Sequence, residues 1–109
     1  MPVNININET NVTACLSGEI DHHSAAMLRE EIDRAIEISY PEVLILDFGG
    51  ATFMDSSGIG LVMGRFKLMQ NISGKVLIEN APKSIKKVFK MSGIDKLLTE
   101  EKRREGSFV

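Results

Sequence analysis

Phe53–Gly60 reads Phe53-Met54-Asp55-Ser56-Ser57-Gly58-Ile59-Gly60 and separates two apolar segments of the chain. The apolar run at residues 43–48 before it predicts a strand, and the helical spacing of apolar residues after it predicts a helix to about residue 71. The stretch therefore predicts a strand end, a short polar loop and a helix start. Asp and Ser are frequent at such starts because their oxygens accept hydrogen bonds from free backbone N–H groups.

A helix start is also a favourable place for negative charge, because its N–H groups are free and its dipole is positive there. A hydroxyl at this position is expected to be exposed and to accept a phosphate without loss of the fold. Ser56 and Ser57 are therefore the first candidates for a modification site. The competing interpretation is that both serines only cap the helix.

On the N-terminal side, alternating apolar and polar residues predict two strands, over residues 3–7 and 12–16, that pair as a hairpin. Ser17-Gly18 is expected to end the second strand. A helix is predicted next, with Ser24 as its N-cap and Tyr40-Pro41 as its end.

The apolar run at residues 43–46 has no alternation, which is typical of a strand covered on both faces, and the polar and glycine residues at 47–50 mark its exit. The helix over residues 56–71 contains Gly60 and Gly64 one turn apart, which predicts close packing against a neighbouring element.

Two apolar stripes on that helix predict either a well-covered central helix or an apolar, partner-facing patch beside the serines. The stripes consist of Ile59, Val62, Met63, Phe66 and Met69, and of Leu61, Leu68 and Ile72.

Lys75–Glu79 is predicted to be a strand, Pro82 to begin a helix and Gly93 to end it. A short strand is expected at Leu97-Leu98, followed by a charged tail or short helix over Thr99–Val109. Because strands and helices alternate along most of the chain, we predict one α/β domain with a mixed sheet that spans residues 1–109.

Composition narrows the functional classes. The chain has 13 Lys and Arg against 15 Asp and Glu, a net charge of -2, which argues against a general binder of nucleic acid or anionic membranes. The single cysteine, Cys15, is unable to form an internal disulfide and favours a reducing compartment. No signal-peptide pattern and no apolar run near the ~18 residues of a membrane span is present. We expect a soluble cytoplasmic protein.

Three catalytic or ligand-binding patterns are incomplete. Gly58-Ile59-Gly60 imitates a dinucleotide fingerprint, but Met63 stands where the third glycine belongs and the chain is short for such a fold. A metal set of His22, His23, Cys15 and Asp21 lacks a second ligand pair at suitable spacing. No Gly-x-Ser-x-Gly elbow supports a hydrolase. We therefore predict no catalytic residue, no cofactor and no metal.

Three blocks of sequence occur in an order that resembles the STAS family of anti-sigma factor antagonists. The first is Gly18–Ala25, the second is Phe53–Gly60 followed by Met63–Lys67, and the third is Met91–Ile94. The likeness covers nearly the whole chain and is greatest to the sporulation antagonists of spore-forming bacilli. It implies a STAS domain, a mixed β-sheet with helices packed mainly on one side.

The resemblance also implies a regulator without catalysis of its own. The unphosphorylated form would bind an anti-sigma factor that is also an ATP-dependent serine kinase, and so release a sporulation sigma factor. Phosphorylation on Ser56 would end the binding, and a separate serine phosphatase would restore it. The partner-binding residues implied are Asp21, Asp55, Ser56, Ser57, Gly58 and Ile59.

Rival functions are a general-stress type of antagonist, a nucleotide-binding enzyme built on the glycine-rich helix start, and a fixed scaffold whose serines only cap. The pairs His22-His23 and Ser56-Ser57 favour the sporulation type.

Overall fold

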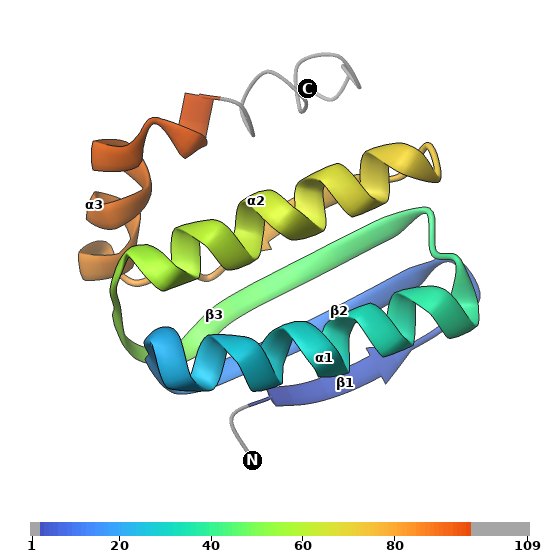
Figure 1. Ribbon diagram of the computed structural model, residues 1–109, viewed down its shortest axis with the longest axis horizontal. Helices are drawn as coiled ribbons and strands as arrows, with labels where there is room; N and C mark the ends of the chain where they lie inside the picture. The colour runs from blue at the N-terminus through green and yellow to red at the C-terminus, as the bar shows by residue number, and fades with distance from the viewer. Residues whose placement is uncertain (1–2, 97–109) are drawn as a thin grey trace.

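The computed structural model describes residues 3–96 as a four-stranded sheet with helices over one face (Figure 1). The elements are β1 (Val3–Ile7), β2 (Asn11–Ile20), α1 (His22–Ser39), β3 (Val43–Met54), α2 (Ser56–Asn71), β4 (Lys75–Glu79) and α3 (Lys83–Ser92). The predicted element order and the α/β class, with a mixed sheet, are confirmed.

The strands lie in the order β1-β2-β3-β4, with β1 antiparallel to β2 and the other two pairs parallel. β1 and β2 form the predicted hairpin. Parallel strands end at the same edge of a sheet, and here Ile20 of β2 is paired with Met54 of β3. Helices α1 and α2 both start at this edge and run side by side across the sheet (Figure 1).

The core lies between the sheet and the helices. Its fully buried members include Leu16, Leu28, Ile32, Leu44, Leu46, Phe48, Val62 and Met69. α3 joins this core at one end, where the rings of Phe48 and Phe89 meet edge to face with centroids 5.4 Å apart.

The prediction that β3 is covered on both faces is wrong. Leu44 and Leu46 are buried, but Val43 and Ile45 are only half-buried on the side that α1 and α2 leave open. A continuous apolar run therefore arose from one packed face and one partly exposed face, rather than from two packed faces.

Both central strands are longer than predicted. β2 continues past Ser17-Gly18 to Ile20, and β3 continues past its glycines to Met54. The pairing of the two strands shifts register between Cys15 and Ser17 and again between Gly18 and Glu19, and Gly18 has φ 77°. Such irregularities bend a strand without ending it, so residues that usually mark a turn lie within the ladder.

The bounds of α3 follow the prediction, since Pro82 precedes the helix and Gly93 ends it with φ 84°. The helix α2 is a well-covered central helix: its apolar side chains are buried or half-buried against the core. The close packing predicted at Gly60 and Gly64 is wrong, because a Cβ on either glycine would meet nothing within 4 Å.

The elements expected at Leu97-Leu98 and over Thr99–Val109 lie outside the described residues. Over residues 3–96, no helix is long and apolar enough to cross a membrane.

Candidate functional site at the paired helix starts

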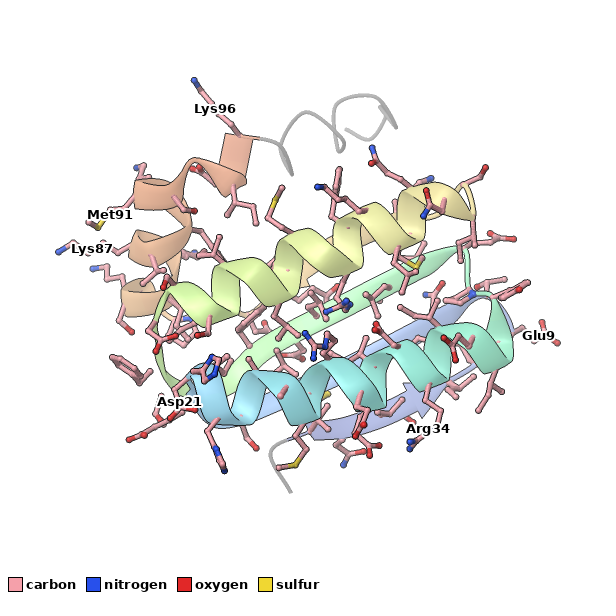
Figure 2. All side chains as sticks on the ribbon, viewed as in Figure 1. Glu9, Asp21, Arg34, Lys87, Met91 and Lys96 are labelled. Atoms are coloured by element: carbon pink, nitrogen blue, oxygen red, sulfur yellow. The ribbon has the colours of Figure 1, made fainter. Side chains whose placement is uncertain are left out.

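Two aspartates lie next to each other where β2 and β3 end. Because Ile20 and Met54 are paired in the sheet, the residues that follow them, Asp21 and Asp55, leave the same edge together. The Asp55 N–H donates to the Ile20 carbonyl at 3.2 Å, which ties the two strand ends to each other. Asp21 lies at the end of the molecule where both helices start (Figure 2).

Asp21, and not the predicted Ser24, is the N-cap of α1. The Asp21 carboxylate accepts from the Ser24 N–H at 2.9 Å, and the Ser24 hydroxyl accepts from the Asp21 N–H at 3.0 Å. This reciprocal pair is a capping box in which Ser24 occupies the third helical position. The Ser24 N–H is the main reason that the pKa of Asp21 is lowered. The stabilisation from this cap is therefore present above the ordinary aspartate pKa and is lost as pH falls through the lowered one.

Asp55 is the N-cap of α2 through a single side-chain hydrogen bond, so the interpretation of Ser56 and Ser57 as caps is wrong. The Asp55 carboxylate accepts from the Ser57 N–H at 2.8 Å. Ser56 is exposed in the first turn of α2, whereas Ser57 is half-buried. The short loop predicted before α2 is a single residue, Asp55, because β3 continues to Met54.

Gly58 allows α2 to start directly over the ends of the strands. A Cβ on Gly58 would lie 2.2 Å from Met54 Cγ and 3.4 Å from Ile20 Cγ2, and Met54 is buried. The neighbouring Ile59 is half-buried and packs against the core. The glycine is thus required for close approach, and Ile59 anchors the first turn.

Gly58→Ala is expected to destabilise the protein by about 1–3 kcal/mol, because the new methyl group overpacks the contact with Met54. Gly60→Ala is the matched control, since a Cβ there meets nothing within 4 Å. This control should stabilise the helix by about 0.5–1 kcal/mol through its better helix propensity. Urea unfolding of both variants measures the two changes. Equal effects would contradict the close approach at Gly58.

Six residues were expected from the resemblance to bind a partner, and the structure brings five of them together at one corner, around the paired caps: Asp21, Asp55, Ser56, Ser57 and Gly58. The sixth, Ile59, follows in the same helical turn but packs inward. Phe53, at the end of β3, adds an exposed apolar side chain there, with 51% of its surface accessible. The exposure of this side chain was not among the predictions made from the sequence.

The metal set of His22, His23, Cys15 and Asp21 gains no support from the fold. Cys15 is half-buried in the middle of β2, away from the strand ends. Within residues 3–96, no group of three or more His, Cys, Asp or Glu side chains is arranged to hold a metal ion.

Sequence reasoning missed an ion pair between the two helices. Arg65 of α2 is buried, and its Nε lies 2.8 Å from Asp33 Oδ1 on α1. Burial raises the pKa of Asp33 and lowers the pKa of Arg65, although each partner's charge opposes the shift of the other. Desolvation therefore outweighs the mutual attraction. The sequence did contain a signal for this pair. Arg65 lies four residues after Leu61 and four before Met69, so it shares their inward face of α2.

Two neighbouring parallel strands that each end at a helix N-cap define a small α/β domain built on a four-stranded mixed sheet. Residues 3–105 match the STAS domain family, and the chain belongs to that family.

The chain is 36% identical over 83 residues to the anti-sigma F factor antagonist of Paenibacillus polymyxa, covering 76% of this chain and 71% of that protein. It is 28% identical over 108 residues to the anti-sigma-B factor antagonist of Bacillus subtilis, covering 97% of each. Its fold is similar to that of the anti-sigma factor antagonist SpoIIAA. The unphosphorylated form has a TM-score of 0.79 at 30% identity over 98% of each chain. The phosphorylated Bacillus form has a TM-score of 0.70 at 33% identity over 86% of each.

Proposed function

We propose that this chain is an anti-sigma factor antagonist switched by phosphorylation on Ser56. The unphosphorylated form binds an anti-sigma factor that is also a serine kinase, and the bound factor releases its sigma factor. The observation that carries the proposal is the exposure of Ser56 in the first turn of α2, beside the two capping aspartates. The names of the similar antagonists, and the existence of a phosphorylated SpoIIAA, support it.

The switch works through charge at a fixed surface. A phosphate on Ser56 adds about -1.5 to -2 charges and three acceptor oxygens. The start of α2 tolerates this charge through its dipole, while Asp55 next to it, and Asp21 on the adjoining cap, repel it. The local fold therefore changes little. A partner docked over Ser56 meets a buried negative charge and is released.

In this proposal the other residues of the site either position the two helix starts or form the surface that the partner contacts. Asp21 and Asp55 hold the two helix starts and present carboxylates to the partner. Ser57 and Gly58 continue the contact surface, and Ile59 fixes the turn from below. A serine phosphatase removes the phosphate from Ser56 and restores binding. Phosphorylation and dephosphorylation both take place in the cytoplasm, where sigma factors act.

Incubation with ATP tests the proposal. The anti-sigma F factor of Paenibacillus polymyxa and the anti-sigma-B factor of Bacillus subtilis serve as candidate kinases. Mass spectrometry of the intact chain should show the gain of one phosphate only when a kinase is present. Ser56→Ala should abolish the gain, and Ser57→Ala should retain it.

The controls separate the rival functions. ATP turnover by the chain alone would indicate a nucleotide-binding enzyme, and no modification with either kinase would indicate a fixed scaffold. Modification by the anti-sigma-B factor alone would favour the general-stress type, for which the coverage of the Bacillus subtilis relative is the supporting observation. The names of the anti-sigma F relatives favour the sporulation type.

A further inference from the structure

β1 is an outermost strand of the sheet, and no strand of residues 3–96 lies beside its outer edge. At the hairpin end, the Asn8 N–H donates to the Asn11 carbonyl at 2.9 Å. Because hydrogen-bonded and non-hydrogen-bonded pairs alternate along an antiparallel ladder, the backbone groups of Asn4 and Asn6 are directed to β2. The backbone groups of the alternate, apolar residues are directed outward; these residues are Val3, Ile5 and Ile7.

This open edge has none of the features that usually keep an edge strand from pairing with another chain. β1 contains no charged side chain and no proline, and its pairing with β2 has no bulge. Its sequence also has nearly the same pattern in both directions about Ile5. If two β1 strands pair antiparallel about Ile5, Val3 lies opposite Ile7, and Asn4 lies opposite Asn6. Apolar side chains then meet apolar ones, and amides meet amides.

The flank of α1 beside this edge carries a regular stripe of side chains. α1 packs over β1 and β2, and its other flank faces α2, where Asp33 contacts Arg65 (Figure 1). Arg34 points away from α2, on the side of β1 (Figure 2). Residues spaced by four, three and four positions lie in one row on a helix, and the row through Arg34 consists of Met27, Glu31, Arg34 and Ile38.

This row is complementary to itself. Met27 and Ile38 at its ends are 42% and 72% exposed, although both are large apolar side chains. Glu31 and Arg34 between them form an exposed ion pair at 3.6 Å. If two copies of the row are laid antiparallel, Met27 lies opposite Ile38 of the second copy, and Glu31 lies opposite Arg34. Both pairs are centred on the same point, between residues 32 and 33.

The centre of the row and the centre of β1 lie at nearly the same height on the sheet. Ile5 is paired with Ala14, which lies about 20 Å before Ile20 at ~3.3 Å per residue. The centre of the row lies about 17 Å beyond Asp21 at ~1.5 Å per residue, and α1 runs back from that same end of the sheet. One two-fold axis can therefore relate two copies of the strand and two copies of the helix at once.

We propose that a second copy of this chain docks on this surface. In the two-fold dimer, the β1 strands pair antiparallel and join the two four-stranded sheets into one, and the α1 rows pack antiparallel above them. The contact area is small compared with a standard interface, so we expect weak association. The proposal does not rest on the proposed function, because the antiparallel arrangement places the two Ser56 residues at opposite ends of the dimer, away from the contact.

Sedimentation equilibrium of the whole chain from about 10 μM to about 1 mM tests the proposal, since this range detects weak pairs. The mass should rise from that of one chain toward that of two. In ¹H–¹⁵N spectra, the amide protons of Val3, Ile5 and Ile7 should exchange more slowly at the higher concentrations, because they become hydrogen-bonded in the dimer.

A charge exchange tests the pairing of the helices. Glu31→Arg should weaken association about tenfold or more, because like charges then face each other twice in each dimer. The double variant Glu31→Arg/Arg34→Glu restores opposite charges and should recover association to within about threefold of the wild type. Ile38→Asp should also weaken association about tenfold. Met91→Asp is the matched control, since Met91 is an 80% exposed apolar residue of α3, and it should leave association unchanged.

The proposal is overturned if the mass stays that of one chain over the whole range. It is also overturned if Glu31→Arg or Ile38→Asp associates like the wild type, or if the double variant associates no better than Glu31→Arg. Concentration-dependent signals confined to β4 or α3 would place the contact elsewhere and overturn it as well. The variants change exposed or half-buried side chains outside the core, and unfolding curves confirm that each of them is folded.

Discussion

Asp33→Ala is expected to lower the free energy of unfolding by about 3 kcal/mol, because it leaves the Arg65 guanidinium buried without its counter-ion. The Arg65 side chain is 8% accessible, so water replaces the lost carboxylate only in part, and Arg29 nearby adds repulsion. Urea unfolding at neutral pH measures the change.

Arg65→Met is the matched comparison. It leaves Asp33, whose side chain is 29% accessible and remains partly hydrated, and methionine fills much of the vacated volume. This loss should be smaller, about 1 kcal/mol. The double variant Asp33→Ala/Arg65→Met should recover most of the larger loss. If the two single losses simply add, the pair is not coupled, and a role in holding α1 to α2 is contradicted.

Ser56→Asp is expected to weaken binding to the anti-sigma factor by about 100-fold. A charge buried at an interface without a partner costs several kcal/mol, and about 3 kcal/mol corresponds to that ratio. Asp55 alongside adds repulsion from the same turn. Calorimetric titration of the variant into the anti-sigma F factor measures the affinity.

Ser56→Ala is the control for this loss. The N-cap of α2 is Asp55, so alanine at residue 56 leaves the cap intact and should keep affinity close to wild type. Equal affinities for the two variants would argue strongly against a charge-operated switch. Unfolding curves of both variants should agree closely, since neither change touches the core.

The sequence was sufficient for the order and type of the elements over residues 3–96, because most of them have a clear apolar period and β3 is a compact apolar run. The ends of the two central strands, β2 and β3, were harder to predict from the sequence. Gly18 and the glycines of β3 are residues that usually indicate turns. Only the pairing of β2 with β3 shows that the hydrogen-bonded strands continue to Ile20 and Met54. Local composition does not report register, which depends on both strands together.

The candidate site was predicted as a set of residues but not as a set of roles. The motif placed Asp55 and Ser56 at a helix start, yet only the structure distinguishes the cap from the exposed hydroxyl. Asp33 and Arg65 are 32 residues apart in sequence, and their pairing depends on how α1 and α2 pack.

The most direct measurement follows the chain carrying a phosphate on Ser56 by ¹H–¹⁵N spectra, before and after addition of equimolar anti-sigma F factor. The account predicts that the phosphate moves only the amide signals around Asp21 and the first turn of α2. It also predicts that the factor then changes nothing, while it broadens or shifts the signals of the unmodified chain. Changes throughout the sheet on phosphorylation, or equal binding by both forms, would contradict a switch that alters the surface and leaves the fold in place.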